Sequence, residues 1–302
     1  MFNKILFATC NLEACDPAAR MAFDIAQKYN AHIYVFHVLG IPTHGYSQLV
    51  IDLTTGEEVT LDENYYDLVK EELSAYCDRV LKNTQKYSFE VTVGYPHREI
   101  LRFARHINPD LIVMGGSTGD IDVSVYKKSI TGSTFQRVAK VSSCPVLVVN
   151  RPAASFWNDF SNVVFGTDFS TAADAAFEFA FRLVQELGCI FHLFHAIDIT
   201  GNKMNKFYKN ESIEKQTRKA KQKILNKYVP LLGEFKQYSV EVEKGIPSVE
   251  IVKYAGEKHA DLIVLPYVAK KTKVDDTPLG NIVEQVIGRA DCQVVSVNQY
   301  FV

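Results

Sequence analysis

The sequence predicts an α/β fold made of two tandem, doubly wound domains, each with a five-stranded parallel sheet. The chain has 302 residues, which is room for two domains. Its 47% hydrophobic and 23% charged residues are typical of a globular protein. A set of short motifs also occurs twice in the same order, which indicates a duplicated domain. We place the two domains at residues 1–150 and 156–302, joined by a short linker.

The duplication is visible in five pairs of motifs that keep their order along the chain. Each pair combines the same apolar pattern with the same small or polar residues, so one ancestral unit explains both halves. The pairs are residues 5–9 with 163–167, 36–37 with 194–195, 94–96 with 245–247, 110–113 with 261–264, and 144–148 with 292–296.

Each half alternates β-branched or aromatic runs with segments of helical period, which predicts a parallel sheet covered by helices. We expect ten strands, five in each half, and a helix after each of the first four strands of a half. The expected strands are residues 5–9, 33–38, 89–93, 111–114 and 144–149, then 163–167, 191–197, 239–242, 262–265 and 292–296.

The helices are predicted from their caps and apolar stripes. Asp16 is the expected N-cap of the first helix, with Pro17 at its first position. Two charged helices are expected at about residues 65–86 and 211–232, and the next helices begin near Pro96 and Pro247. Residues 40–63 are expected to form a surface excursion.

Ligands of open parallel sheets bind beyond the carboxyl ends of the strands, where the strand order reverses. Two glycine-containing runs of the first half fall there. Backbone N–H groups of glycines and of a helix N-terminus can hold a phosphate, although the glycines could instead only turn the chain and Ser133 only cap a helix. The candidate anion-binding residues are Gly115, Gly116, Gly119, Gly132, Ser133 and Thr134.

The second half differs at the same places. Pro266-Tyr267-Val268-Ala269 replaces the first glycine run, while Gly280-Asn281 remains before the last helix. After the first strand, Thr167-Asp168-Phe169-Ser170 offers a carboxylate that could accept hydrogen bonds from a ribose or a base, where the first half has Thr9-Cys10-Asn11. An N-cap role for Asp168 or Ser170 explains these residues equally well.

These residues together resemble the universal stress protein family, and the chain resembles a tandem member of it. The resemblance covers nearly the whole chain and is most specific in the glycine loop, Gly116, Gly119, Gly132 and Ser133. Twelve residues separate Gly119 from Gly132, about three more than in the family pattern. The family's aspartate after the first strand is matched by Asp168 and replaced by Cys10.

The resemblance implies an adenine nucleotide alpha hydrolase-like fold and a ligand, ATP or another adenine nucleotide, with Mg²⁺ only alongside it. It further assigns Val38 and Ala196 as residues whose backbone meets adenine, and it extends the nucleotide site to Thr9, Asp168, Gly280 and Asn281. It also implies that the two halves pair internally about a pseudo-twofold axis through their last strands. A further homodimer is compatible with this arrangement.

We therefore expect a stress-response protein that binds an adenine nucleotide in at most one half, the first being favoured by its glycines, without efficient catalysis. An alternative is an interaction scaffold in which both sites have decayed, as Cys10 and Pro266 would suggest. Slow ATP hydrolysis is a third hypothesis. No nucleophile–base pair and no Gly-x-x-x-x-Gly-Lys-Ser/Thr loop supports it, so no catalytic residue is assigned.

The composition limits the classes of partner that the chain is expected to bind. A formal net charge of −2 gives no overall attraction to nucleic acid, and no apolar run approaches the ~20 residues that span a membrane, so a cytoplasmic protein is expected.

The lysines of the helix around residues 214–227 could form a nucleic-acid patch or a solvated amphipathic face, and the latter is favoured. Six scattered cysteines indicate neither disulfides nor zinc, no metal is assigned, and Cys10 or Cys15 could be a redox-sensing thiol.

Overall fold

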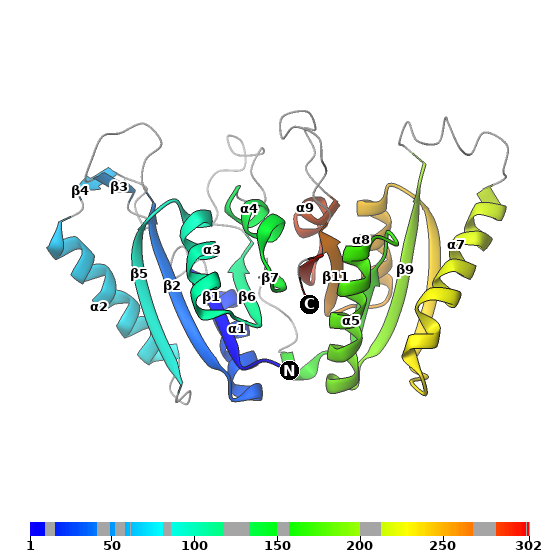
Figure 1. The fold of residues 1–302 in the computed structure, drawn as a ribbon, viewed down its shortest axis with the longest axis horizontal. Helices are drawn as coiled ribbons and strands as arrows, with labels where there is room; N and C mark the ends of the chain where they lie inside the picture. Colours follow the sequence, from blue (N-terminus) through cyan, green and yellow to red (C-terminus); the bar gives the residue numbers. More distant parts are fainter. Residues whose placement is uncertain are drawn as a thin grey trace. The chain divides into compact units, whose positions relative to one another are not determined.

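The computed structural model describes residues 1–9, 16–40, 49–51, 58–60, 62–80, 86–116, 133–149, 157–199, 213–267, 282–299 and 301. They form two compact units, Met1–Asn158 and Asp159–Val302. Each unit is an α/β domain built on five parallel strands (Figure 1). The predicted fold class is therefore confirmed. The expected linker falls on residues 150–155, which lie outside the described residues.

In the first unit the main sheet has the order β5-β2-β1-β6-β7, and every neighbouring pair is parallel. A separate antiparallel pair, β3 and β4, lies within the segment that we expected to be an irregular excursion. The strands are β1 Lys4–Thr9, β2 His32–Gly40, β3 Leu49–Ile51, β4 Glu58–Thr60, β5 Tyr87–Gly94, β6 Leu111–Gly115 and β7 Val146–Val149.

The helices of the first unit follow the sheet order. The chain moves outward through α1 and α2 and then returns through α3 and α4, so right-handed crossovers place the two pairs on opposite faces. α1 begins at Asp16 itself rather than after it as a cap. The helices are α1 Asp16–Tyr29, α2 Glu63–Val80, α3 Pro96–Ile107 and α4 Ser133–Val141, followed by the short helix η1 Trp157–Asp159.

The second unit repeats this plan with the order β10-β9-β8-β11-β12, again all parallel. Its elements keep the same sequence of strand and helix as their counterparts. They are β8 Asn162–Gly166, α5 Thr171–Leu187, β9 Ile190–Asp198, α7 Ile213–Lys227, η2 Val229–Leu232, β10 Tyr238–Gly245, α8 Pro247–Glu257, β11 Leu262–Tyr267, α9 Ile282–Ile287 and β12 Gln293–Asn298.

The apolar runs that predicted the central strands form the two cores. Nearly every residue of β1, β6 and β7 is buried in the first unit, as are most residues of β8, β11 and β12 in the second. Strands buried on both faces read as continuous apolar runs. In each unit the first strand lies between its second and fourth strands, so the strand order reverses there, and a ligand crevice is expected beyond its carboxyl end.

No helix among the described residues has the length and apolar character required to cross a bilayer. The longest described helix, α2, has 18 residues and carries charged residues throughout.

His37 makes the stability of the first unit depend on pH. Burial lowers the pKa of this histidine from 6.5 to about 4, against a smaller opposing effect of the Thr9 carbonyl. The unfolded chain therefore binds a proton that the folded unit does not bind between these two values, and stability is lost as the pH falls through that window. Lowering the pH from 7 to 5 is expected to cost roughly 2 kcal/mol through His37.

Urea unfolding followed by tryptophan fluorescence measures this effect, because Trp157 is the single tryptophan and is buried in the first unit against Phe2 and Tyr29. The free energy of unfolding differs between pH 7 and pH 5, and in a His37→Gln variant this difference should be smaller by roughly 2 kcal/mol, whatever the variant's stability at pH 7. An unchanged pH dependence in the variant would rule out this role for His37.

Candidate functional site

A cavity of about 230 Å³ opens in the second unit beyond the carboxyl ends of β8, β9 and β11. This is the crevice predicted by the reversal of strand order at β8. Side chains from α8 and α9 close its other side. The lining residues are Gly166, Thr167, Asp168, Phe194, His195, Ala196, Asp198, Pro247, Ile251, Leu265, Pro266, Ile282 and Val283.

The interior of the cavity is apolar. Phe194, Ile251, Leu265 and Val283 are all buried lining residues. Gly166 permits this arrangement, because a Cβ at that position would lie 2.5 Å from Ile251 Cδ1 and 2.6 Å from Leu265 Cδ2. Glycine thus leaves room for the ends of the Ile251 and Leu265 side chains over the end of β8, which makes this part of the wall apolar.

Asp168 forms the turn that leads from β8 into α5. Its Oδ1 accepts hydrogen bonds from Ser170 N at 3.0 Å and from Ser170 Oγ at 2.5 Å. Ser170 is the N-cap of α5, and its Oγ accepts from Ala173 N at 3.2 Å. Of the two N-cap candidates, Ser170 is therefore the cap, while Asp168 holds the cap in place and also lines the cavity.

His195 contributes a second acceptor. Its Nδ1 lies 2.7 Å from the Thr167 carbonyl oxygen, so Nδ1 carries the proton and donates. Burial lowers the pKa of His195 and Lys223 lowers it further, against the opposing effects of the Thr167 carbonyl and Asp168. The imidazole is consequently neutral at pH 7, and its Nε2 presents a lone pair.

The charged side chains of the described lining are both acidic. Asp168 and Asp198 are exposed and lie at the mouth of the cavity, and the described lining contains neither lysine nor arginine. Together with His195 Nε2, these groups offer hydrogen-bond acceptors. The described walls therefore suit a ligand that brings hydrogen-bond donors.

Tyr228 ties the loop after β8 to two helices. Its buried hydroxyl lies 2.9 Å from Thr167 Oγ1 and donates to Asp174 Oδ1 at 3.2 Å. Burial, more than the neighbouring carboxylates, raises the pKa of this phenol, so it stays protonated. The first unit repeats the contact between tyrosine and aspartate, because Tyr76 donates to Asp16 Oδ1 at 3.1 Å. The duplicated pair joins the helix after the second strand to the helix after the first.

Phe169 also packs against its neighbours in the loop after β8. Its φ of +62° is in the left-handed region, which is rare for a bulky residue and requires support from its surroundings. The ring lies 4.7 Å from the His195 ring, and Lys223 Nζ lies 4.1 Å from the ring centroid. Phe169 is therefore held between α7 and β9, which fixes the position of Asp168 beside it.

The first unit presents fewer described groups at its corresponding crevice. Thr9 Oγ1 is buried and has no hydrogen-bond partner among the described residues. Val38, the counterpart of Ala196, is also buried. Gly115 ends β6, and the N–H of Gly116 donates to the Val149 carbonyl at 3.0 Å, so that N–H is not available to an anion.

Several predicted residues lie outside the described part of the chain. These are Gly119, Gly132, Gly280, Asn281, Cys10 and Cys15. Ser133 and Thr134 begin α4, as expected of residues at a helix N-terminus. The glycine loop as an anion site and the redox role of the two cysteines therefore stay predictions.

The cavity brings together the predicted Asp168 and Ala196 and adds residues that were not predicted as ligand-binding. His195, Asp198, Pro247 and Ile251 are not among the binding residues that the sequence predicts. The repeated Gly-x-Pro motif with its following Glu-Ile could have identified Pro247 and Ile251, since both halves preserve it.

The remaining titratable groups do not suggest metal or thiol chemistry. Burial raises the thiol pKa of Cys77 and Cys292 to about 12 and that of Cys144 to about 11. These thiols are therefore unreactive at neutral pH. Within the described ranges, no three histidine, cysteine or acidic side chains lie close enough to hold a metal ion.

The fold and the cavity define a class of protein, namely tandem α/β domains with a cavity at the strand-order switch of the second domain. The model of the universal stress protein family matches residues 1–150 and again residues 159–298. The chain therefore belongs to the universal stress protein family and contains its domain twice.

Individual relatives agree with this assignment. Universal stress protein MJ0531 of Methanocaldococcus jannaschii is 30% identical over 164 residues, which are 50% of this chain and 84% of that protein. Universal stress protein YxiE of Bacillus subtilis is 29% identical over 157 residues, 49% of this chain and 99% of that protein. Each relative thus corresponds to about half of the present chain.

Solved structures support the tandem fold. A universal stress protein from Archaeoglobus fulgidus aligns with a TM-score of 0.71 and 21% identity, covering 98% of this chain and 96% of that one. A second, described as a putative universal stress protein from Pseudomonas aeruginosa, aligns with a TM-score of 0.63 and 16% identity over 98% and 93%. At these identities the likeness establishes the fold alone.

Removing the Tyr228 hydroxyl should destabilise the second unit. Tyr228→Phe leaves buried Thr167 Oγ1 and the Asp174 carboxylate without this partner, so the free energy of unfolding should fall by about 1–2 kcal/mol. Urea unfolding followed by circular dichroism measures the change. Tyr87→Phe is the matched control, because the Tyr87 hydroxyl donates to Asp78 in an exposed pair and its loss should cost little. Equal effects of the two substitutions would contradict the role given to Tyr228.

Proposed function

We propose that this universal stress protein binds an adenine nucleotide and holds its nucleoside part in the cavity of the second unit. The position of that cavity, at the strand-order switch beyond β8, is the observation that carries the proposal. The glycines of the first unit had favoured that half. The cavity favours the second, and residues 10–15 and 117–132 of the first unit lie outside the described residues.

The chemistry of the cavity supports a nucleoside. An adenine ring has two apolar faces that suit Phe194 and Ile251, and its exocyclic amine and the ribose hydroxyls are donors that suit His195 Nε2 and the Asp168 carboxylate. The volume of about 230 Å³ lies below the ~300–1,000 Å³ of pockets for drug-sized ligands, which fits a nucleoside better than a whole triphosphate. The phosphates would lie outside the described lining, and any Mg²⁺ would accompany them.

We assign binding without rapid turnover. In the described lining, His195 is the one histidine; burial lowers its pKa, and its Nδ1 is committed to the Thr167 carbonyl. The lining also lacks a serine, cysteine or lysine that could act as a nucleophile beside it. The residues that line the cavity can orient a ligand but do not form a nucleophile–base pair.

A scaffold function without any nucleotide is the second candidate. It is favoured by the acidic mouth of the second-unit cavity and by the Gly116 N–H, which the Val149 carbonyl already occupies. The two candidates differ in a simple observation, because a scaffold would take up no nucleoside in either unit.

Isothermal titration of the full chain with adenosine, AMP and ATP tests the proposal. Adenosine and AMP should release or absorb heat with a stoichiometry of one per chain. Ala196→Leu places a larger side chain in the cavity and should weaken adenosine binding by at least about tenfold. Val38→Leu, the same position of the first unit, is the matched control and should bind adenosine normally.

Two results of these titrations would contradict the proposed site. Loss of binding in Val38→Leu with normal binding in Ala196→Leu would move the site to the first unit and overturn the present assignment. Absence of heat with every ligand, for protein that is folded by circular dichroism, would favour the scaffold.

The charge of Asp168 should contribute to affinity. Asp168→Asn keeps an oxygen that can accept from Ser170 and preserve the turn, but it replaces one carboxylate oxygen with an amide donor. Adenosine should bind about five- to tenfold more weakly with little change in melting temperature, because one hydrogen bond to a charged group is lost. Glu178→Gln, an exposed charge removal on α5, serves as control. Unchanged affinity in Asp168→Asn would exclude a contact between ligand and carboxylate.

A further inference from the structure

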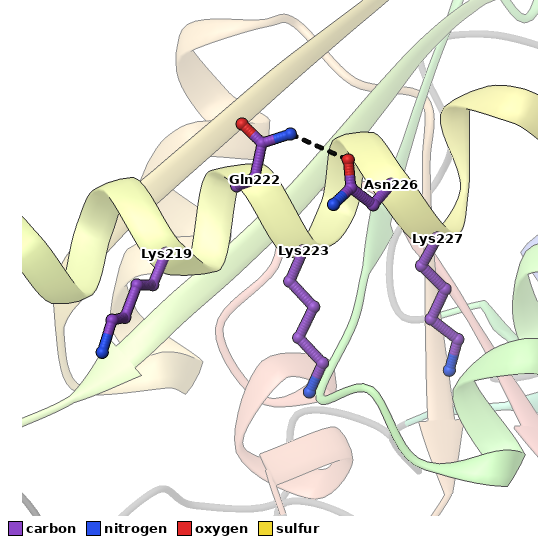
Figure 2. A pocket seen from close by; sticks show the side chains of 5 residues that line it. All are labelled: Lys219, Gln222, Lys223, Asn226 and Lys227. Carbon is purple, nitrogen blue, oxygen red and sulfur yellow. Dashed lines mark hydrogen bonds between the residues drawn. The ribbon is translucent and has the colours of Figure 1, made fainter.

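Three side chains at or just after the C-terminal end of α7 contact the chain that follows β8. Tyr228 donates to Asp174 at 3.2 Å, and Lys227 forms an ion pair with the same carboxylate at 2.6 Å. One turn earlier, the Nζ of Lys223 lies 4.1 Å from the centre of the Phe169 ring. Figure 2 shows Lys223 and Lys227 extending in the same direction from successive turns of α7. The helix therefore contacts both the loop after β8 and the start of α5.

The first unit keeps only part of this arrangement. Its contact between tyrosine and aspartate is made by Tyr76 and Asp16. When α2 is aligned with α7 on the two tyrosines, Glu71 stands at the position of Lys223. α7 carries six basic residues and one acidic residue, whereas α2 carries two basic and five acidic ones. The lysine above the aromatic ring thus belongs to the second unit, in which the described cavity opens.

Phe169 depends on its neighbours because of its backbone conformation. Its φ of +62° lies in the left-handed region, which is costly for a residue with a bulky side chain. Its N–H donates to Thr167 Oγ1 at 3.0 Å, and its ring lies 4.7 Å from the His195 ring. Lys223 adds a cation over the ring, which attracts the electrons of the ring face. These contacts together hold Phe169 in a conformation that it would otherwise leave.

Two groups next to Phe169 line the cavity. Asp168 precedes it in the chain, and His195 packs against its ring. Lys223 is exposed and lies outside the described lining. The contact between Lys223 and Phe169 can therefore be removed without changing any side chain of the cavity wall.

We propose that Lys223 is a positioning residue for the second-unit cavity. Its positive charge holds the Phe169 ring in place, and the ring holds Asp168 and His195 where they can accept hydrogen bonds from a ligand. When the charge is removed, Phe169 leaves the left-handed region and both cavity groups shift with it. The effect on affinity rests on the proposed nucleoside function, whereas the effect on the two rings does not.

Nuclear magnetic resonance of the full chain with labelled phenylalanine and histidine tests this positioning directly. Lys223→Met removes the charge but keeps an unbranched side chain, while Lys223→Arg keeps a cation that can stack on the ring. Lys221→Met, an exposed charge removal on the same helix, is the matched control. The contact between ring protons of Phe169 and His195 should be lost in Lys223→Met and retained in the unmodified protein and the other two variants.

The pKa of His195 separates positioning from a simple charge effect. Burial lowers this pKa and the charge of Lys223 lowers it further, so Lys223→Met should raise it. A raised pKa with an unchanged ring contact, in protein that is folded by circular dichroism, would mean that Lys223 acts through its charge alone and would overturn the inference. Loss of the ring contact in Lys221→Met would overturn it as well.

Isothermal titration with adenosine measures the consequence for binding. Lys223→Met should weaken binding about three- to tenfold, and Lys223→Arg should bind like the unmodified protein. Phe169→Asn completes a double-mutant cycle, because asparagine tolerates the left-handed conformation and offers no ring to hold. Asparagine also stands at this place in the first half, as Asn11.

In the Phe169→Asn background, Lys223→Met should cause no further loss of affinity. An equal loss in both backgrounds would contradict the role given to Lys223. If the unmodified protein takes up no adenosine, the proposed function fails, and the ring contact in Lys223→Met still decides whether Lys223 positions the cavity.

Discussion

The parallel pairing of β8 with β9 on one side and with β11 on the other is the constraint on which the site depends. Because the chain after β8 runs toward β9 and the chain after β11 runs the other way, toward β12, no crossover covers the carboxyl ends of β8 and β11. Gly166 then leaves room for the ends of the Ile251 and Leu265 side chains, so the end of the strand becomes an apolar floor. The cavity is in this sense a consequence of topology, and the residues around it determine which ligand it could hold.

Those residues form one hydrogen-bonded assembly. The Thr167 carbonyl fixes the His195 tautomer, Thr167 Oγ1 meets the Tyr228 hydroxyl, and Asp168 anchors the cap of α5. Phe169, in a left-handed conformation, is held between His195 and Lys223. A cavity whose acceptors are positioned in advance loses little conformational freedom when a donor-rich ligand binds. The same assembly connects the cavity to α7, the helix whose surface charge distinguishes the second unit from the first.

The repeat allowed the fold to be predicted from the sequence, because continuous apolar runs such as residues 111–114 and 262–265 identify buried parallel strands in both halves. Asp168 follows β8 and Ala196 lies near the end of β9, as expected from the sequence, while their contact with a ligand stays a prediction. The hairpin of β3 and β4 was missed, since its short strands lie among turn residues without a clear alternating pattern. Pro247 and Ile251 were missed as lining residues because side-chain approach across a crevice depends on helix packing, which local patterns do not encode. The hydrogen bond from the Gly116 N–H to the Val149 carbonyl could not be predicted either, because it depends on the register of the strands.

A crystal structure of the full chain grown with adenosine tests the central claim most directly. The account predicts one adenosine per chain in the second-unit cavity, with its base against Phe194 and Ile251 and with donors facing His195 Nε2 and the Asp168 carboxylate. Adenosine bound at the first-unit crevice instead, or a cavity beyond β8 closed by the chain's own residues with no ligand, would contradict it.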